Sequence, residues 1–479
     1  MSVVRHGLHD LRYEPRGRRL PPRPDPQVGE PPLAGASIKA LNHSFARTLE
    51  THLGETVNVK GMGALGNGSA DDTQKIQDAI DLAFGPTDNP HGYGGGELAN
   101  KPLYLPAGDY KVSAPAAMTV LGAASAPTGN NIKLTVNSTA NYKTGQLCYV
   151  IGLNGVTNNG NSMVAGANYG IQVNDLTHIT LRSTVYGGTW TSGGTITRAA
   201  LQIHNVTGGR IVGAGREACR ITVTTPNSSV LAINGMARSH IEGIDFAATG
   251  TGTAVDFDFD FAHVSRGDDA STQSTQSNLF VSVGFTSGAY GIRCGLHGQQ
   301  VSENTFLNCF WAGSSVAGLY ISNYNALSMS VMGGNIQGCG IGIFVWAGSC
   351  PIIHGVGFQN QVDADIAVEN SAGDGYSITA CRSETSLNNT TFVRVHAGPP
   401  TVIACCTQIG TARTGAIFAF CEVGLPPSGT GAMIIDACYS DAGRIAGNGT
   451  VYIRGNAGGI AFSNTGYLSG FGGVVAQNI

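Results

Sequence analysis

The stretch VDFDFDF, at residues 255–261, alternates acidic and aromatic side chains without a break. In an extended strand successive side chains point to opposite faces, so the aspartates would share one face and the phenylalanines the other. If the phenylalanines fill a core, the carboxylates face water, and those two residues apart stand about 6.5–7 Å from each other. The acidic face comprises Asp256, Asp258 and Asp260, and the aromatic face Phe257, Phe259 and Phe261.

This carboxylate spacing suits more than one kind of chemistry. It is close to the lower end of the roughly 6.5–9.5 Å that separates the acid and the base of inverting glycosidases. Mutual repulsion would raise the pKa of at least one carboxyl, as a general acid requires. We therefore predict that Asp258 acts as acid or base, with Asp256 or Asp260 as its partner. Two alternatives stay open: the same oxygens could bind Ca²⁺, or the trio could simply be a solvated outer face.

Apolar strand segments return at regular intervals from residue 240 onward. Between Phe285 and Arg382 the members of one set end 25, 26, 22 and 24 residues apart. That set comprises IEGIDF, LFVSVGF, NTFLNCF, SVMGGNI, IIHGVGF, YSITACR, TVIACCT and MIIDACY, and a trailing set comprises VDFDFDF, YGIRCG, GLYISN, GIGIFVW, ADIAVEN, FVRVH, AIFAF and VYIRG. Two registers that repeat together at one coil length predict a parallel β-helix, whose stacked coils share one dry core.

Any site must then lie on the outside of the coils, where outward residues form columns about 4.8 Å apart. Carried through the following coils, the acidic face of 255–261 continues as a mixed aromatic and charged column, which we predict binds substrate. Its members are Arg293, Tyr320, Phe344 and Asp365, with Trp346 and Glu369 nearby. Exposed aromatics beside charges are typical of a sugar platform, and packing between subunits is the alternative use of such a stripe.

A second group of charged residues lies next to strand ends on another wall. Arg382 and Glu384, in CRSET, are predicted to form an ion pair rather than a second site, and Glu303 lies on the same wall. His354, within an apolar run, is predicted to be a hydrogen-bonded wall residue rather than a base.

Two segments carry a resemblance to a known family. VNVKGMGALGNGSADDTQKIQDAID, at 57–81, and LYLPAGDYKVS, at 103–113, are similar to the opening of the pectate-lyase superfamily, which includes phage tailspikes. Met62 and Asn67 depart from the family's usual aromatic and aspartate. The resemblance implies a right-handed parallel β-helix whose open end is covered by a strand and a helix. The family's NTD, DD and GHG site motifs do not occur in their usual arrangement, so no catalytic residue is carried over.

Composition and pattern divide the chain into four parts. Residues 1–40 are basic and Pro-rich and are predicted to be a flexible arm, and 41–127 form a cap and the first coils. A helix is predicted at 72–84, with Ser69, Asp71 and Asp72 as capping residues. Short strands between Gly and Asn turns at 128–198 resemble a small inserted β-barrel, and 199–479 hold the main β-helix.

The overall balance of residues excludes several classes of function. The 479 residues include 69 glycines but only 12% charged residues, with a net charge of −4, which does not favour binding to nucleic acid or to a membrane. The N-terminus has no apolar core of the kind that a signal peptide needs. The eleven cysteines lie mostly singly in apolar runs and are predicted to be buried thiols, without a metal or cofactor.

Taken together, these features predict a β-helix that binds and cleaves an extracellular polysaccharide as a tailspike-like depolymerase, either hydrolase or lyase. The alternative is a non-catalytic virion structural or adhesion protein that binds surface glycan with the same wall. The resemblance further implies a homotrimer located in a virion or released by lysis, with the N-terminal arm as an attachment to the virion or baseplate.

Overall fold

The computed structural model divides the chain into two compact units, Met1–Gly54 and Glu55–Ile479. In the first unit β1 (Ser37–Ile38) pairs antiparallel with β2 (Arg47–Thr48), and nearly all of the predicted arm at 1–40 lies outside the described residues. The described residues are 37–38, 47–48, 55–85, 101–123, 131–158, 161–164, 166–182, 186–258, 275–295, 301–369, 375–385, 391–395, 401–410, 419–423, 432–440, 444–447, 450–454, 457–458 and 474–477.

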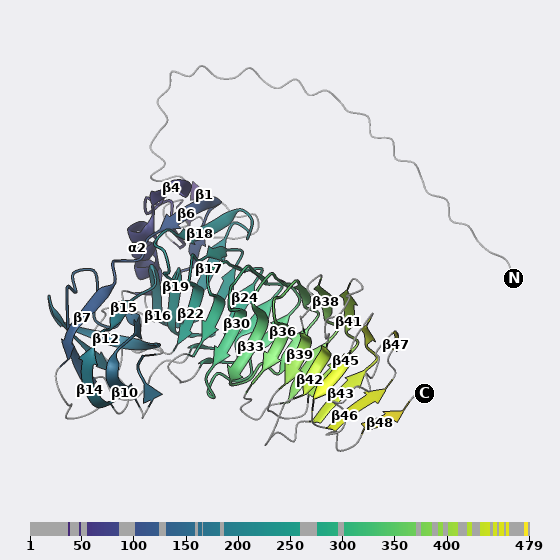
Figure 1. The fold of residues 1–479 in the computed structure, drawn as a ribbon. Helices are drawn as coiled ribbons and strands as arrows, with labels where there is room; N and C mark the ends of the chain where they lie inside the picture. The colour runs from purple at the N-terminus through teal and green to yellow at the C-terminus, as the bar shows by residue number, and fades with distance from the viewer. Residues whose placement is uncertain are drawn as a thin grey trace, which may run out of the picture. The chain divides into compact units, whose positions relative to one another are not determined.

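Three long parallel sheets run along the second unit and form the walls of a β-helix (Figure 1). Sheet 1 consists, in spatial order, of β27 (Val301–Ser302), β23 (Thr275–Gln276), β19 (Leu231–Ala237), β22 (Thr253–Asp258), β26 (Tyr290–Cys294), β30 (Ala317–Ser322), β33 (Ile341–Ala347), β36 (Ala364–Val368), β39 (Thr391–Val395), β42 (Ala419–Val423) and β45 (Arg444–Gly447), with β16 (Leu201–Thr207) paired to β19.

Sheets 2 and 3 alternate along the chain, one strand of each per coil. Sheet 2 consists of β3 (Val57–Asn58), β5 (Leu103–Leu105), β17 (Arg210–Gly213), β20 (His240–Glu242), β24 (Leu279–Val281), β28 (Thr305–Leu307), β31 (Ser330–Met332), β34 (Ile352–His354), β37 (Tyr376–Thr379), β40 (Thr401–Ala404), β43 (Ala432–Asp436), β46 (Thr450–Arg454) and β48 (Val474–Gln477). Sheet 3 consists of β4 (Asn67–Asp71), β6 (Gly108–Val112), β18 (Cys219–Val223), β21 (Asp245–Ala247), β25 (Gly284–Thr286), β29 (Phe310–Ala312), β32 (Asn335–Gln337), β35 (Gly357–Gln359), β38 (Arg382–Thr385), β41 (Thr407–Gly410), β44 (Tyr439–Ser440) and β47 (Ala457–Gly458). The first set of repeated segments therefore contains two strands, not one.

The turn from sheet 2 to sheet 3 requires one left-handed residue in each coil. In eight coils that residue has a φ between 49° and 68°. The positions are Gly243, Ser282, Asn308, Gly333, Gly355, Ala380, Cys405 and Ala437. A single residue in this conformation redirects the strand within two residues, so the two sheets meet at a sharp corner.

The cylinder is filled by aromatic side chains that stack from coil to coil. The Phe285 ring lies 6.4 Å from Phe246 and 5.4 Å from Trp311, with near-parallel planes. Phe257 is buried in the same core, as predicted, with its ring 5.2 Å from Phe280. The sequence repeat aligned Phe310 with Phe285, which is wrong by one residue: Trp311 pairs with Phe285, and Phe310 lies on the outer face.

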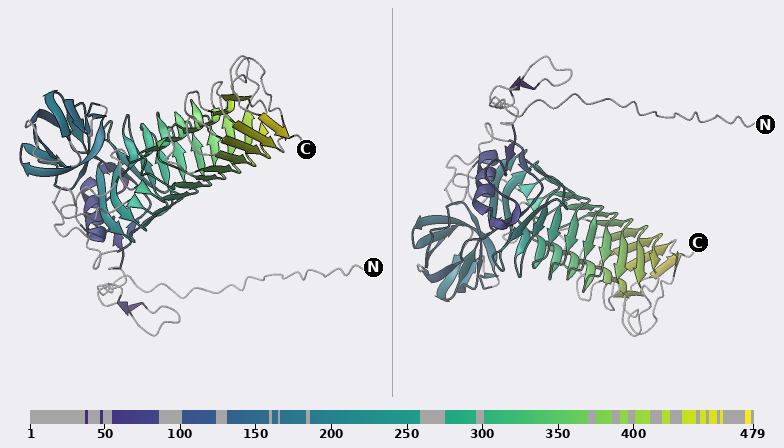
Figure 2. Two further views of the ribbon diagram at one scale, coloured as in Figure 1. Left: turned by 90° about the horizontal axis from the view of Figure 1, so that it is seen from below. Right: turned by 90° about the horizontal axis from the view of Figure 1, so that it is seen from above.

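One helix, α2 (Thr73–Phe84), packs its apolar face on the N-terminal coils, which confirms the predicted helix (Figure 2). The capping prediction holds only in part. Asp71 accepts a hydrogen bond from the Thr73 backbone N–H, whereas the Asp72 carboxylate accepts from the backbone of Leu65 and Gly66 and does not cap the helix. No helix among the described residues is long and apolar enough to cross a bilayer.

The predicted small barrel is confirmed as a closed antiparallel barrel beside the first coils (Figures 1 and 2). Its strands, in order, are β12 (Ala167–Asp175), β13 (His178–Arg182), β8 (Asn131–Val136), β7 (Met118–Ala123), β15 (Thr195–Thr197) and β9 (Leu147–Ile151), and β11 (Asn161–Ser162), β10 (Asn154–Asn158) and β14 (Tyr186–Ser192) form a small sheet next to it. The Gln202 side chain bonds both the N–H and the C=O of Leu147, which fixes the barrel to β16.

The cysteines are interior residues of the coils and of the barrel. The ten whose side chains the structure describes are free thiols, and all of these are buried except Cys405. The prediction of buried thiols is therefore confirmed for the buried members and wrong for Cys405. Its exposure follows from its place in the left-handed corner column, because a residue there points away from the core.

We expect the interior stack to carry much of the stability. Replacing Trp311, which is fully buried, by alanine should lower the free energy of unfolding by about 3–5 kcal/mol, because it empties a large volume between Phe285 and Ile336. Trp346→Ala is the matched control: Trp346 is 50% exposed, so its loss should change stability by less than about 1 kcal/mol. Chemical denaturation followed by circular dichroism measures both, and equal losses would contradict the assignment of inside and outside.

Candidate functional site

The outer face of sheet 1 carries one continuous column of residues in register. Asp256 pairs with Arg293, Arg293 with Tyr320, and Tyr320 with Phe344. Strand pairing thus brings together four side chains that are up to 88 residues apart in the sequence. The predicted alignment of Arg293, Tyr320 and Phe344 on one wall is present in the structure, while their role in binding stays a prediction.

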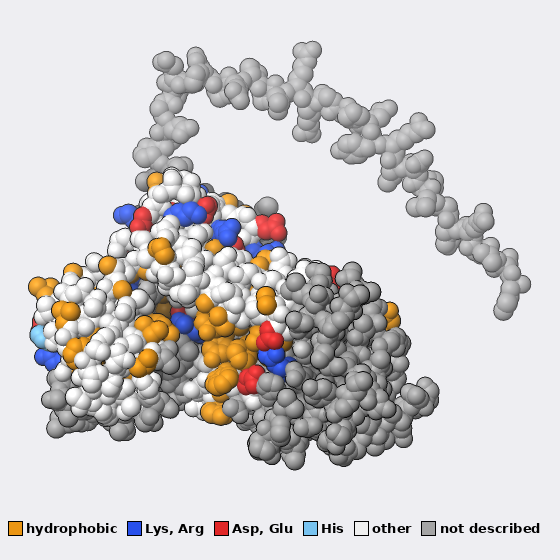
Figure 3. Space-filling model, in the orientation of Figure 1, with side chains coloured by type: hydrophobic (Ala, Val, Ile, Leu, Met, Phe, Trp, Pro, Cys, Tyr) orange, Lys and Arg blue, Asp and Glu red, His pale blue; other side chains and the backbone are white. Residues whose placement is uncertain are grey.

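Aromatic rings stack along this column and continue to an exposed end. Tyr290 and Tyr320 are stacked with centroids 5.1 Å apart, Tyr320 and Phe344 are 5.3 Å apart, and Trp346 meets Phe344 edge-on at 6.2 Å. We call these four residues the aromatic stripe. Small apolar side chains such as Ala317, Ala364 and Ala367 pack beside it. Figure 3 shows hydrophobic side chains gathered on the face of sheet 1, with charged side chains at the edge.

The stripe contains a hydrogen-bond donor as well as an apolar surface, because the phenol of Tyr320 is protonated at neutral pH. Burial raises the pKa of Tyr320 further, to about 12, with a contribution from Tyr290. A protonated phenol half-buried among rings presents one O–H at the surface.

At one end of the stripe Asp256 and Arg293 form a buried ion pair. The Arg293 Nε donates to Asp256 Oδ1 at 2.7 Å, and the two residues are only 7% and 4% exposed. The guanidinium lies 4.7 Å from the ring centroid of Tyr149, in the barrel strand β9, and 5.4 Å from that of Tyr290. Burial alone would lower the pKa of Arg293, but the charge of Asp256 and the hydrogen bond to it outweigh burial and raise it.

The expectation that Asp256 faces water is therefore wrong. Its side chain does leave the cylinder on the outer face, but the barrel packs over that end of sheet 1 and removes it from solvent. The other two acids cannot be placed in the same way. The backbone of Asp258 ends β22, in register with Asn234, and its side chain lies outside the described residues, as do Asp260, Phe259 and Phe261.

Asp365 does not belong to the outer column either, which corrects the prediction. It lies at the position of Gly342 in the preceding coil, where an added Cβ would meet the interior ring of Phe358. Asp365 is fully buried and accepts a short hydrogen bond from Ser383, which replaces Phe358 in the interior column. The residue in register with Phe344 on the outer face is Ala367.

An arginine that the sequence reading missed closes the other end of the stripe. Arg394 is in register with Ala367 and donates from both Nη atoms to the two carboxylate oxygens of Asp363, each at 2.7 Å. Its Nε lies 3.9 Å from Glu369, a predicted neighbour of the site. Alternation within FVRVH would have found Arg394, because its neighbours Val393 and Val395 are buried.

A small pocket joins the barrel to sheet 1, and we call it the junction pocket. It has a volume of about 70 Å³, which is room for a few waters or one substituent of a larger ligand. Arg198 lines it beside Arg293 and Asp256, and burial lowers the pKa of Arg198. Its remaining lining includes Leu147, Tyr149, Thr197, Ala199, Asn227, Ser229, Ala232, Thr251 and Gly252. The barrel thus contributes residues to the same wall as the stripe.

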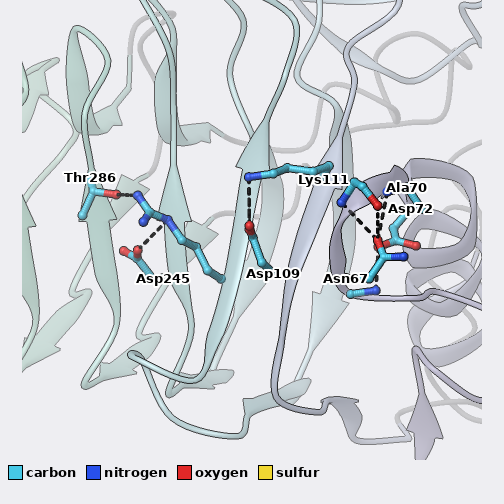
Figure 4. A network of polar contacts seen from close by, with 10 residues as sticks. Asn67, Ala70, Asp72, Asp109, Lys111, Asp245 and Thr286 are labelled. Carbon is cyan, nitrogen blue, oxygen red and sulfur yellow. Dashed lines mark hydrogen bonds and ion pairs between the residues drawn. The ribbon is translucent and has the colours of Figure 1, made fainter.

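Sheet 3 carries a separate row of charged side chains on its outer face (Figure 4). Lys111 lies 3.0 Å from Asp109, and Arg220 lies 3.2 Å from Asp245 while reaching Thr286 at 3.5 Å. Burial raises the pKa of Asp245 against the opposing charges of Arg220 and Arg216. An acid with a raised pKa beside two arginines is a candidate acid–base group that the sequence reading missed.

The remaining predicted wall residues behave as structural groups. Arg382 and Glu384 form the predicted ion pair on sheet 3. His354 Nδ1 is 2.8 Å from the Thr379 hydroxyl, so it is hydrogen-bonded as predicted. Glu303 accepts a hydrogen bond from the Ser277 hydroxyl of the preceding coil at 2.6 Å.

Comparison with known proteins agrees with this architecture at its N-terminal end. Residues 56–120 match the family model described as "Rhamnogalacturonase A/epimerase, pectate lyase-like". That segment contains α2 and the first strands of sheets 2 and 3, over which the coils then stack. The chain is a parallel β-helix, and its residues 56–120 are pectate-lyase-like.

Some curated sequences and solved structures are similar to this chain, over a short segment or at low identity. The mannuronan C5-epimerases AlgE3 and AlgE1 of Azotobacter vinelandii are each 52% identical over 56 residues, which is 12% of this chain but only 2% and 3% of their own length. Among solved structures, the Streptococcus pneumoniae adhesin PfbA is 12% identical over 85% of this chain and 95% of that chain, with a TM-score of 0.39. The gp54 tailspike of Acinetobacter baumannii bacteriophage AP22, solved with capsular saccharide, is 9% identical over 88% of this chain and 78% of that chain, with a TM-score of 0.29. None of these likenesses assigns a role to a residue of this chain.

The buried pair in the β-helix gives a testable stability effect. Asp256→Ala leaves Arg293 buried without its carboxylate and should lower the free energy of unfolding by about 3–5 kcal/mol. The double variant Asp256→Ala/Arg293→Met should recover most of that loss, because no charge is then left buried. Glu384→Ala, which breaks the more exposed pair with Arg382, is the control and should cost under about 1 kcal/mol. A double variant no more stable than Asp256→Ala would contradict this account.

Asp245 should make stability depend on pH. Because its pKa is raised in the folded state, the charged form is disfavoured there, and its contribution to stability is lost as the pH rises from about 4 through the raised pKa. The melting temperature of the wild type should therefore fall relative to that of Asp245→Asn as the pH rises from about 4 to 7. Glu217→Gln, which removes a carboxylate with an 87% exposed side chain, is the control for the loss of one charge. A difference in melting temperature that stays constant over this pH range would show that the pKa of Asp245 is not raised in the folded state.

Proposed function

We propose that the protein binds an extracellular polysaccharide along the outer face of sheet 1 and processes it there. The observation that carries the proposal is the aromatic stripe, because four aromatic residues follow one another on a flat wall and end in a half-exposed tryptophan. Soluble proteins seldom leave such a surface uncovered unless it makes contact with something.

The geometry of the stripe suits an extended sugar chain. The rings of Tyr290, Tyr320 and Phe344 are spaced by little more than the distance between neighbouring strands, so a chain along the coils meets a repeated apolar surface. Sugar rings have apolar faces that pack on aromatic rings, while their hydroxyls need polar partners at the rim. The Tyr320 phenol and the carboxylates of Asp363 and Glu369 would supply them.

In the catalytic form of the proposal, Asp258 acts as the general acid or base beside the buried pair. Asp256 is engaged by Arg293 at 2.7 Å, which leaves Asp260 as the second reacting carboxylate. The match to a family described by a rhamnogalacturonase and an epimerase supports processing of polysaccharide, and hydrolysis and β-elimination remain alternatives.

The second candidate function is binding without cleavage, as in an adhesion or virion structural protein. The burial of Asp256 favours it, because one member of the predicted acid trio is withdrawn from solvent. From the resemblance to tailspikes we further propose that the protein is a homotrimer located in a virion or outside the cell. The N-terminal arm would then attach it to the virion.

Cleavage and binding can be separated with two substitutions. A panel of polysaccharides is assayed for new reducing ends and for absorbance at 235 nm, which reports β-elimination. Asp258→Asn should abolish either signal, and cleavage that survives would remove the acid trio from catalysis. Trp346→Ala should weaken binding about tenfold, as expected for the loss of one stacking ring, with little change in stability. Binding without cleavage by the wild type would favour the adhesion alternative.

A further inference from the structure

A groove runs along the solenoid where the chain turns from sheet 3 into sheet 1, and none of its lining residues belongs to the aromatic stripe. It has a volume of about 400 Å³ and is open to solvent. Eight residues from four successive coils line it: Thr286, Ser287, Ala312, Gly313, Gln337, Gly338, Gln359 and Asn360. We call it the amide groove.

Two columns of equivalent residues build the amide groove. Thr286, Ala312, Gln337 and Gln359 are in register as the last outward positions of β25, β29, β32 and β35. The next residue in each coil adopts a left-handed conformation, at Ser287, Gly313, Gly338 and Asn360, with φ between 54° and 68°. At this turn the coils at the two ends of the groove carry a serine and an asparagine. The two coils between them carry glycine and so place no side chain there.

The two central glycines are what leave the groove open. A Cβ built on Gly313 or on Gly338 meets no atom within 4 Å, so it would project into empty space. Ser287 and Asn360 show that the left-handed backbone by itself does not demand glycine here, since asparagine and serine adopt it in the same column. Packing within the chain therefore does not require glycine at these positions; the left-handed backbone favours it but also tolerates serine and asparagine in the same column.

The groove has hydrogen-bonding groups but no charge along its length. The Gln337 Oε1 accepts from Asn335 at 3.4 Å and the Gln359 Nε2 donates to Glu384 at 3.4 Å. These bonds leave the Gln337 Nε2 and the Gln359 Oε1, which make no hydrogen bond with the described residues. None of the eight lining residues is charged. At one end Arg220, which is paired with Asp245, reaches Thr286, and at the other end Glu384 accepts from Gln359 (Figure 4 shows Asp245 and Thr286).

We propose that the amide groove binds a neutral oligosaccharide segment, as a glycan site separate from the aromatic stripe. Amides and hydroxyls match the alternating donors and acceptors of sugar hydroxyls. An acidic ligand would find no cation among the lining residues, and the arginine that reaches Thr286, Arg220, is already paired with Asp245. The coils cross the groove about every 4.8 Å, close to the length that one pyranose adds to an extended chain, so one sugar would face each coil. This inference does not depend on catalysis or binding at sheet 1.

Affinity electrophoresis of the full chain tests the proposal. Native gels contain dextran, galactomannan, xyloglucan, hydroxyethylcellulose or pullulan as neutral probes, and polygalacturonate or alginate as acidic ones. The measurements are made in the Trp346→Ala background, so that retention through the aromatic stripe is reduced. At least one neutral polymer should retard this protein, and adding Gly313→Asn and Gly338→Asn should raise the apparent Kd at least about tenfold by filling the groove.

Matched variants keep the outcome decisive. Ala380→Asn places the same side chain at another exposed left-handed position, in the corner between sheets 2 and 3, and should leave retardation unchanged. If the glycine variants do not fold, Gln337→Ala/Gln359→Ala removes the amides without a demand on the backbone and should weaken binding likewise. Absence of retardation by every neutral polymer, or equal retardation with and without the groove substitutions, overturns the amide groove as a glycan site and leaves the proposal for sheet 1 untouched.

Discussion

The constraint on which this molecule depends is that each coil must satisfy its backbone hydrogen bonds with the coils on either side. Parallel ladders do this only when successive coils stay in register, so the same corner must recur at the same place in each coil. The left-handed residue between sheets 2 and 3 shows the strength of the constraint. Serine, alanine and cysteine adopt there a conformation that side chains usually avoid, because any other backbone would break the ladder.

Register also fixes the volume that each coil places inside the cylinder. In one coil the facing interior positions hold Gly342 and Phe358, in the next Asp365 and Ser383, and in the third Phe392 and Gln408. The interior phenylalanine thus lies on sheet 3 in the first coil and on sheet 1 in the third. In the coil between them the two positions hold Asp365 and Ser383, which are hydrogen-bonded to each other. A buried carboxylate is costly unless it is hydrogen-bonded, so Asp365 and Ser383 act as one unit that fills the space between two aromatic coils. Asp365 therefore has a structural role in the interior, although the sequence pattern placed it on the outer face.

The repeat in the sequence was enough to predict the β-helix, the inward Phe257 and the alignment of Arg293, Tyr320 and Phe344, because strand period and coil length are local properties. Two errors at the site have different causes, and local alternation fails in only one of them. At Asp365 the strand has just left a corner, and two neighbouring residues both face inward. At Asp256 alternation holds, but burial comes from Tyr149 in the barrel, more than a hundred residues earlier. No period in the sequence encodes which coil an inserted barrel will cover.

The position of the barrel changes what the wall of sheet 1 can do. Tyr149 and Tyr290 both contact the Arg293 guanidinium, and its Nε is bonded to Asp256, so this arginine is held in place and no longer a mobile surface charge. Arg394 at the other end of the stripe is likewise held in a bidentate pair with Asp363. Between these two neutralised ends the surface is apolar. Shape and ring stacking therefore govern contact with the stripe more than net charge does, and the proposed ligand, the uncharged face of a sugar chain, meets that requirement better than a strongly charged one would.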